Sequence, residues 1–284
     1  MLTVLESIKL STEFLTNKGI ESPRVNAELM LAKILNCKRL DLYLSFDRPL
    51  NEQETNLYRE FIRRRSKFEP LQYILGSVEF YGMEFIVDKS VLIPRPETEI
   101  LVETILNSFN KEDELNILDI GTGSGIIAIS LAKYLPSSSV TAIDLSESAL
   151  NKAKENAKLN EVENQINFMS SDITTSDFKH QNNFDIIVSN PPYISLDEYQ
   201  NLAPELRLYE PKSALTDNSD GLNFYRIICR ESNSLLKKGG KLFFELGQGQ
   251  SKEVSDLMMK ENFSNIIIKK DYQNIDRVIC GELI

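Results

Sequence analysis

Closely spaced glycines follow an apolar run in the segment LDIGTGSG, residues 118–125. Glycines let a backbone turn sharply and approach a ligand, and a helix that starts at such a turn offers free N–H groups. The spacing is G-x-G-x-G, whereas the dinucleotide fingerprint G-x-G-x-x-G would need glycine where Ile126 stands. The loop therefore predicts a ligand site that is not a dinucleotide site, and a bare glycine turn is the alternative. Its candidate binding residues are Gly121, Thr122, Gly123, Ser124 and Gly125.

Three acidic residues accompany this loop. Asp144 ends the next predicted strand, 23 residues after Gly121, where a carboxylate can accept both hydroxyls of a ribose. Asp172 follows the third strand and can accept from the exocyclic amine of an adenine, whose edge the neighbouring Ile173 can cover. Taken singly, each of these two acids is better explained as a helix cap or a loop residue. Together with the glycines they favour an adenosine-containing ligand without pyrophosphate, and S-adenosylmethionine fits, with Asp119 near its ammonium and sulfonium charges.

The fourth predicted strand ends in Asn190-Pro191-Pro192-Tyr193, a sequence that could hold a planar amino group. Two prolines fix the backbone and remove two N–H donors, so the corner presents carbonyls and the Asn190 amide oxygen. The protons of an NH₂ group can bond to Asn190 Oδ1 and the Pro191 carbonyl, while Tyr193 packs on the plane and can stabilise a nearby cation. An amide nitrogen is a poor nucleophile, and two such acceptors favour its in-line attack on a methyl carbon. A rigid proline turn is the alternative.

The elements that must position these residues follow from the pattern after residue 94, where apolar runs alternate with helical stretches. The predicted strands are 115–120, 139–143, 166–169, 184–188 and 241–245, and the predicted helices are 97–108, 126–134, 146–159 and 221–236. Such alternation predicts βαβ units, a parallel sheet and right-handed crossovers. Two further strands, 265–268 and 277–280, have no long helix between them and predict an antiparallel edge pair, which makes a mixed seven-stranded sheet.

The chain before residue 94 has a different pattern. Residues 1–74 carry apolar residues at helical spacing with turn residues at 17–19, 22–23 and 47–49, which predicts a bundle of about four helices. Residues 76–93 alternate and are rich in Val, Phe, Tyr and Ile, which predicts a short hairpin that turns at Tyr81-Gly82. We therefore expect a helical substrate-recognition domain at 1–74, a β-hairpin linker at 75–93 and a catalytic α/β domain at 94–284.

Charge and cysteine content limit the classes of function. The 284 residues include 32 Lys and Arg against 42 Asp and Glu, a net charge of −10, which argues against a protein that mainly grips nucleic acid phosphates. Residues 1–74 hold 12 basic and 10 acidic residues, and their basic run at 63–67 is either a solvated helix face or a docking patch for an acidic partner. The cysteines, Cys37, Cys229 and Cys280, form no C-x-x-C pair. Together with a start that does not resemble a signal peptide, this predicts a cytoplasmic protein without disulfides, bound metal or membrane segment.

The combination of D-x-G-x-G-x-G with N-P-P-Y resembles the Rossmann-like methyltransferases that modify amides or exocyclic amines. Adenine N6 methyltransferases of DNA and RNA share this pattern with protein-glutamine methyltransferases. Three further segments resemble the HemK/PrmC family, and with them the resemblance covers nearly the whole chain. These segments are PLQYILG at 70–76, IPRPETE at 93–99, and YEP at 209–211 with Ala214-Leu215 and Asp220-Gly221-Leu222.

The resemblance implies an S-adenosylmethionine-dependent enzyme, with S-adenosylhomocysteine as product and no metal. Its substrate would be the glutamine side-chain nitrogen (N5) in the Gly-Gly-Gln motif of peptide chain release factors, so that it modulates translation termination. We expect a monomer without direct nucleic acid binding. The implied contacts to S-adenosylmethionine are residues 121–125, Asp144, Asp172, Ile173 and Asn190, and the implied glutamine site is Asn190, Pro191, Pro192 and Tyr193.

Three alternatives remain open at this point. A paralogous glutamine methyltransferase of a ribosomal protein resembles this chain but lacks the Pro-Glu-Thr-Glu run at 96–99. A nucleic acid adenine methyltransferase would carry a basic target-reading domain, which this acidic chain does not suggest. The third alternative is a non-catalytic S-adenosylmethionine-binding module. The sequence assigns no role to Glu245 or Gln250, and residues 95–99 could be only a helix start.

Overall fold

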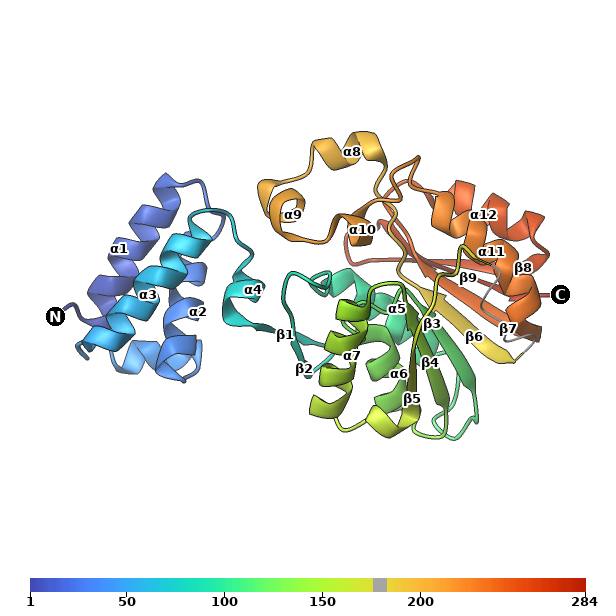
Figure 1. Cartoon of the computed structure of the whole chain (residues 1–284), viewed down its shortest axis with the longest axis horizontal. Helices are drawn as coiled ribbons and strands as arrows, with labels where there is room; N and C mark the ends of the chain where they lie inside the picture. The colour runs from blue at the N-terminus through green and yellow to red at the C-terminus, as the bar shows by residue number, and fades with distance from the viewer. Residues whose placement is uncertain (176–182) are drawn as a thin grey trace. The chain divides into compact units, whose positions relative to one another are not determined.

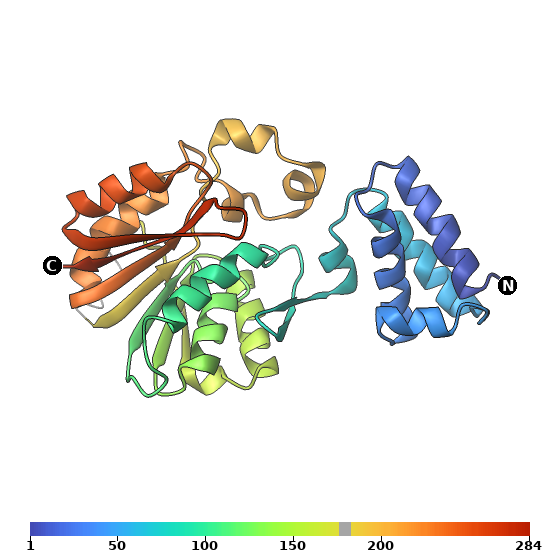
Figure 2. The same cartoon turned by 180° about the vertical axis from the view of Figure 1, so that it is seen from behind.

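The computed structural model of the chain describes residues 1–175 and 183–284, and Figures 1 and 2 show it from opposite sides. Two compact units are present. The first comprises Met1–Ser77 together with Ala203–Tyr209, and the second comprises Val78–Leu202 together with Glu210–Ile284. The sequence pattern gave no indication that a short segment from the middle of the α/β region would pack with the N-terminal helices.

The first unit is helical. Its elements are α1 (Val4–Asn17), α2 (Pro23–Leu35), the 3-10 helix η1 (Arg39–Leu44), α3 (Glu52–Arg65), α4 (Leu71–Leu75) and α9 (Pro204–Tyr209). Two of the helices start with a capping box, in which the side chain of the cap residue accepts from the third helical N–H and a glutamate there bonds back. Thr3 and Glu6 form this pair at α1, and Asn51 and Glu54 form it at α3. The prediction of a helical bundle is thus correct.

The basic run at the end of α3 is not a free cationic surface. Arg65 is 4% exposed and donates to Asn26 Oδ1 at 2.6 Å, to the Glu69 carbonyl at 3.0 Å and to Glu205 Oε1 at 2.6 Å. Arg64 pairs with the Glu69 carboxylate at 2.7 Å. Two of the cations in the run therefore hold the first unit together, and neither interpretation of the run from the sequence describes them.

A β-hairpin begins at the end of the first unit. Strands β1 (Ser77–Phe80) and β2 (Met83–Ile86) pair across the two residues Tyr81 and Gly82, whose φ angles are 50° and 73°. Positive φ at both positions is the signature of the type I′ turn that suits the twist of a two-residue hairpin. The hairpin prediction is therefore correct.

The second unit contains a seven-stranded sheet in the order β5-β4-β3-β6-β7-β9-β8. Its strands are β3 (Asn116–Ile120), β4 (Ser139–Asp144), β5 (Ile166–Ser170), β6 (Phe184–Ser189), β7 (Leu236–Glu245), β8 (Phe263–Lys270) and β9 (Asp276–Leu283). The first five pair in parallel, and β9 runs antiparallel to both β7 and β8. The predicted mixed sheet is confirmed, while β7 starts five residues earlier than the predicted strand because it follows the preceding helix directly.

Helices cover both faces of this sheet. The helices of the second unit are α5 (Pro96–Leu106), α6 (Ile126–Tyr134), α7 (Glu147–Leu159), α8 (Leu196–Gln200), α10 (Lys212–Leu215), α11 (Asn223–Leu235) and α12 (Ser251–Lys260), with the 3-10 turn η2 (Glu163–Gln165) before β5. Helices α5, α6 and α7 pack on one face and α11 and α12 on the other (Figure 1). Neighbouring strand residues alternate between the two cores, as Ile186 and Ile187 do, because successive side chains point to opposite faces. Helix α12 was not predicted.

In the part of the chain that the structure describes, no helix is long and apolar enough to cross a membrane.

Candidate active site

The candidate site lies where the strand order reverses. From β3 the chain moves outward through β4 and β5, and it then returns to place β6 on the other side of β3. Ligands of open α/β sheets bind outside the carboxyl ends of the strands at this switch point. A pocket of about 470 Å³ is found here, with a wall that includes residues after β3, β4, β5 and β6. Its volume is in the usual range of small-molecule sites, about 300–1,000 Å³.

The glycine turn after β3 is held by its neighbours. The N–H groups of Gly121 and Thr122 both donate to the Ile143 carbonyl, at 2.9 and 3.0 Å, and Gly123 N donates to Asp144 Oδ2 at 2.9 Å. A Cβ atom added at Gly121 would meet nothing within 4 Å, which leaves room for a ligand beside the backbone. The turn is thus fixed in shape and open on the pocket side.

Asp119 lies in β3 directly before the turn and is fully buried. Its Oδ2 accepts from Thr122 Oγ1 at 2.7 Å and from Ala128 N at 3.2 Å, whereas its Oδ1 has no hydrogen-bond partner among the described residues. Burial raises the pKa of Asp119 to about 7, and the charge of Asp144 adds to this rise. Oδ2 of Asp119 therefore stabilises the turn through these hydrogen bonds, and Oδ1 can accept from a further donor.

The two acids after β4 and β5 line the pocket. Asp144 accepts from Gly123 N through one oxygen and from Ser146 N, at 2.8 Å, through the other, so its orientation is fixed. Asp172 accepts from Thr174 N at 2.8 Å, and the adjacent Ile173 is buried in the same wall.

Eight of the residues predicted from the sequence line this pocket and five do not. Those in the wall are Gly121, Gly123, Asp144, Asp172, Ile173, Asn190, Pro191 and Pro192. Those that do not line it are Asp119, Thr122, Ser124, Gly125 and Tyr193. Further lining residues come from segments that the sequence did not single out, namely Lys89, Ser90, Val91 and Leu92 after the hairpin and Phe224 and Ile228 on α11.

The corner after β6 is tied to α5 and β7. Asn190 Nδ2 donates to Thr98 Oγ1 at 3.2 Å, and the Tyr193 hydroxyl donates to Glu245 Oε1 at 3.3 Å. Gln250 Nε2 donates to the Tyr193 carbonyl at 2.9 Å. Burial and the nearby Glu245 carboxylate raise the pKa of Tyr193 well above its ordinary value, so the phenol stays protonated and donates.

Glu245, the last residue of β7, is the buried carboxylate of this corner. It is 1% exposed and accepts from Thr98 Oγ1 at 2.6 Å. Burial raises the pKa of Glu245 to about 7, against the lowering effect of its two hydrogen bonds and of the Arg277 charge. No sequence pattern marked Thr98 as a partner of this residue.

The segment at 93–99 forms a second anchor. Arg95 donates to Glu210 Oε1 at 2.7 Å, and the other oxygen of that buried carboxylate accepts from Ile93 N at 3.3 Å. Glu99 Oε1 accepts from Tyr81 N in the hairpin turn at 2.7 Å. These residues do more than start α5, because they fix the segment before α5 to the segment before α10.

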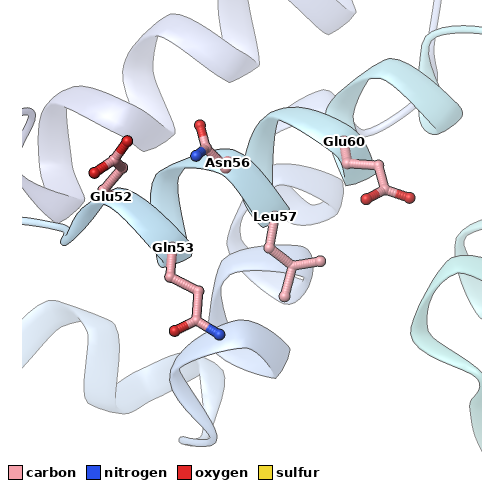
Figure 3. Close-up of a pocket in the computed structure, with 5 residues that line it drawn as sticks. All are labelled: Glu52, Gln53, Asn56, Leu57 and Glu60. Carbon is pink, nitrogen blue, oxygen red and sulfur yellow. The ribbon is translucent and has the colours of Figure 1, made fainter.

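A second hollow, of about 630 Å³, lies on α3 and is lined by Glu52, Gln53, Asn56, Leu57 and Glu60. Figure 3 shows that all five side chains project from one helix. Among the described residues its wall comes from this one helix, so the hollow is a depression of the surface that brings together no groups from different elements.

The fold is that of S-adenosylmethionine-dependent methyltransferases. Residues 96–220 match the methyltransferase small domain family. The hMettl16 catalytic domain, solved in complex with a MAT2A 3′UTR hairpin, superposes with a TM-score of 0.60 at 16% identity, over 77% of this chain and 84% of that one, which supports the fold alone.

Within this class, the chain belongs to the release factor glutamine methyltransferase family. Residues 6–76 match the PrmC N-terminal domain. The release factor glutamine methyltransferase of Chlorobaculum tepidum is 41% identical over 282 residues, which cover 97% of this chain and 95% of that protein. The protein of the same name from Fusobacterium nucleatum is 50% identical over 224 residues, which cover 78% of this chain and 62% of that relative.

Proposed function

We propose that the protein transfers the methyl group of S-adenosylmethionine to the side-chain amide nitrogen of the glutamine in the Gly-Gly-Gln motif of peptide chain release factors. The observation that carries the proposal is the corner Asn190-Pro191-Pro192-Tyr193, which follows β6 beside the glycine turn and contributes three residues to the wall of the pocket. Membership of the family supports the same substrate.

The residues at the carboxyl edge of β3, β4 and β5 fit S-adenosylmethionine. The backbone at Gly121 and Gly123 is open, so the ligand can approach the turn closely. The Asp144 carboxylate, held by Gly123 N, can accept from the ribose hydroxyls, and the apolar Ile173 can cover an adenine edge. The free Oδ1 of Asp119 leaves one buried acceptor behind the turn. S-adenosylmethionine supplies an electrophilic methyl group held on a positively charged sulfur.

The corner after β6 would hold the glutamine. Asn190 Oδ1 and the Pro191 carbonyl accept the two amide protons, which positions the nitrogen and stabilises positive charge that develops on it. Pro192 cannot offer a competing N–H donor. Transfer then needs no strong base beforehand, because the proton can leave after the new N–C bond has formed. The ring of Tyr193 packs behind the corner in the core below α11 and α12.

We assign recognition of the release factor to the helical unit, in a monomeric enzyme that acts in the cytoplasm and does not bind nucleic acid directly. The unit makes up about 30% of the chain, and none of its residues lines the pocket. Its role would therefore be to bind the protein substrate rather than the methyl donor.

A transfer assay tests this proposal. The purified chain is incubated with methyl-labelled S-adenosylmethionine and a bacterial release factor, or with the same factor in which the motif glutamine is replaced by alanine. We expect label only in the unaltered factor. The Asn190→Ala variant of the enzyme serves as the matched control for a contaminating activity.

Equal labelling of both release factors would refute the substrate assignment. Label that appears instead in ribosomal protein or in RNA, when these are offered in parallel, would favour one of the alternatives considered from the sequence.

A further inference from the structure

We propose that Glu245 is a positioning residue. Through the Thr98 hydroxyl, it determines which end of the Asn190 side-chain amide faces the pocket. Through the Tyr193 hydroxyl, it also holds the Tyr193 ring in place. The inference rests on the proposed function and deepens it, since it concerns how the glutamine site is kept in its working form. It joins three elements that are distant in sequence, namely α5, the corner after β6 and the end of β7.

The three side chains form a continuous hydrogen-bonded chain. Asn190 Nδ2 lies 3.2 Å from Thr98 Oγ1, and Thr98 Oγ1 lies 2.6 Å from Glu245 Oε2. Thr98 is fully buried and Glu245 is 1% exposed, so water does not compete for these groups. The short distance between Thr98 and Glu245 is typical of a hydroxyl that donates to a carboxylate.

The direction of this chain follows from counting protons. While Glu245 is ionised it only accepts, and the single proton of the Thr98 hydroxyl is then committed to it. The hydroxyl oxygen can then only accept from its other neighbour, so the Asn190 amide must turn its NH₂ group toward Thr98. Since Asn190 lines the pocket, Oδ1 is the end that remains for the protons of a substrate amide.

Loss of the carboxylate would remove this selection. A hydroxyl that is free to rotate can donate to the Asn190 oxygen as readily as it accepts from the nitrogen. The Asn190 amide would then populate both orientations. In the inverted orientation its NH₂ group would face the NH₂ group of the substrate amide, and neither group could accept a hydrogen bond from the other. Turnover would fall because fewer enzyme molecules hold an acceptor in place. The residues after β3, β4 and β5 that we assign to the methyl donor would be unchanged.

Tyr193 is fixed at two points by the same region. Its hydroxyl donates to Glu245 Oε1 at 3.3 Å, and its carbonyl accepts from Gln250 Nε2 at 2.9 Å. The other end of the Gln250 amide accepts from Gly247 N at 3.2 Å. A Cβ at Gly247 would lie 2.9 Å from Tyr193 Cδ2, so the backbone packs closely on the ring. These contacts explain the two residues of the segment FFELGQGQ that the sequence left without a role.

The position of the carboxylate also argues for a functional role. A buried ionisable group with few neutralising partners destabilises a fold relative to an apolar or amide side chain of similar size. Arg277 is the main opposite charge that acts on Glu245, and Glu97 opposes it. Stability alone would not favour a carboxylate here.

The test compares Thr98→Val with Thr98→Ser. Valine keeps the shape and removes the hydroxyl, and serine keeps the hydroxyl. We expect Thr98→Val to lower kcat on the release factor about tenfold or more, as expected for a displaced catalytic acceptor, with the Kd for S-adenosylmethionine changed less than about threefold. Thr98→Ser should retain most of the turnover. Glu245→Gln should behave like Thr98→Val, and the double variant should be no worse than the poorer single one.

Tyr225→Phe is the matched control, because it removes a buried hydrogen bond of 2.8 Å to the Glu245 carbonyl without touching the chain to Asn190. We expect Tyr225→Phe and Thr98→Val to reduce the urea midpoint of unfolding by similar amounts. Tyr225→Phe should nevertheless leave kcat unchanged. Wild-type turnover in Thr98→Val, or an equal loss of kcat in Tyr225→Phe, would overturn the inference.

A measurement that does not depend on activity separates this inference from the proposed function. In protein labelled with ¹⁵N-asparagine, the Asn190 side-chain NH₂ resonances, assigned by their loss in Asn190→Ala, should show slow solvent exchange in wild type and fast exchange in Thr98→Val. Equal exchange in both proteins would overturn the inference. An inactive wild-type protein with this exchange pattern would instead count against the proposed substrate alone.

Discussion

Replacing Gly125 by alanine tests whether the close packing of Ile129 and Ala153 on the glycine turn requires a glycine at this position. Gly125 caps α6 at φ 85°, and a Cβ there would lie 2.8 Å from Ile129 Cδ1 and 3.1 Å from Ala153 Cβ. The left-handed backbone costs alanine about 1–2 kcal/mol, and the overpacking adds about 1–3 kcal/mol. We therefore expect Gly125→Ala to lower the free energy of unfolding by about 2–5 kcal/mol.

Gly121→Ala is the control that isolates the packing contribution. Gly121 has a similar φ of 73°, but a Cβ there meets nothing within 4 Å. Only the backbone strain applies, so the expected loss is about 1–2 kcal/mol. Urea unfolding followed by circular dichroism measures both variants against wild type. If both variants lost the same free energy of unfolding, the contacts of position 125 with Ile129 and Ala153 would not contribute to the cost. That result would refute the packing argument.

Three further results are expected. Asn190→Ala should reduce turnover by a factor on the order of 10², because one transition-state acceptor is lost, while calorimetry should give a nearly unchanged affinity for S-adenosylmethionine; unchanged turnover would contradict the role. Burial raises the pKa of Asp119 and Glu245 to about 7, so the folded chain holds protons that the unfolded chain releases near about pH 4. The urea midpoint should therefore fall as the pH rises from about 4 to about 7, and less so in Asp119→Asn; a rising midpoint would count against it. Arg65→Ala should destabilise the protein by about 3 kcal/mol and the exposed Arg63→Ala by less than about 0.5 kcal/mol, as compared by thermal unfolding; equal effects would show that the Arg65 contacts contribute little.

The alternation of strands and helices could be predicted from the sequence because burial imposes it directly. The parallel strands of the sheet centre are covered on both faces, so they consist of nearly continuous apolar residues, and the helices between them show a period near 3.6. The hairpin was equally local, since the turn at Tyr81-Gly82 determines it. Helix α12 carried a signal that was overlooked, because its buried residues Val254 and Met258 are four positions apart.

The two chemical motifs of the site were also visible, because each is a short run whose residues act together. The supports of these motifs were not. Thr98 and Glu245 are 147 positions apart, and only the packing of α5 on the end of β7 brings them together. The pocket wall contributed by Phe224 and by the segment after the hairpin depends in the same way on tertiary structure.

Charge patterns were the least informative part of the sequence. The run at 63–67 has the composition of a solvated or docking surface, yet Arg65 is buried among acceptors. Its partner Glu205 is supplied by α9, far along the chain. A local pattern cannot reveal that a later segment folds back into the first unit.

Mass spectrometry of the product tests the central claim most directly. A bacterial release factor is incubated with the full chain and S-adenosylmethionine, digested, and the peptide that contains Gly-Gly-Gln is fragmented. The account predicts a mass gain of one CH₂ group, carried by the side-chain nitrogen of the glutamine. At the same early time point, Asn190→Ala should give a methylated fraction smaller by a factor on the order of 10². A methyl group on any other residue, or an unmodified peptide from an enzyme that binds S-adenosylmethionine, would contradict it.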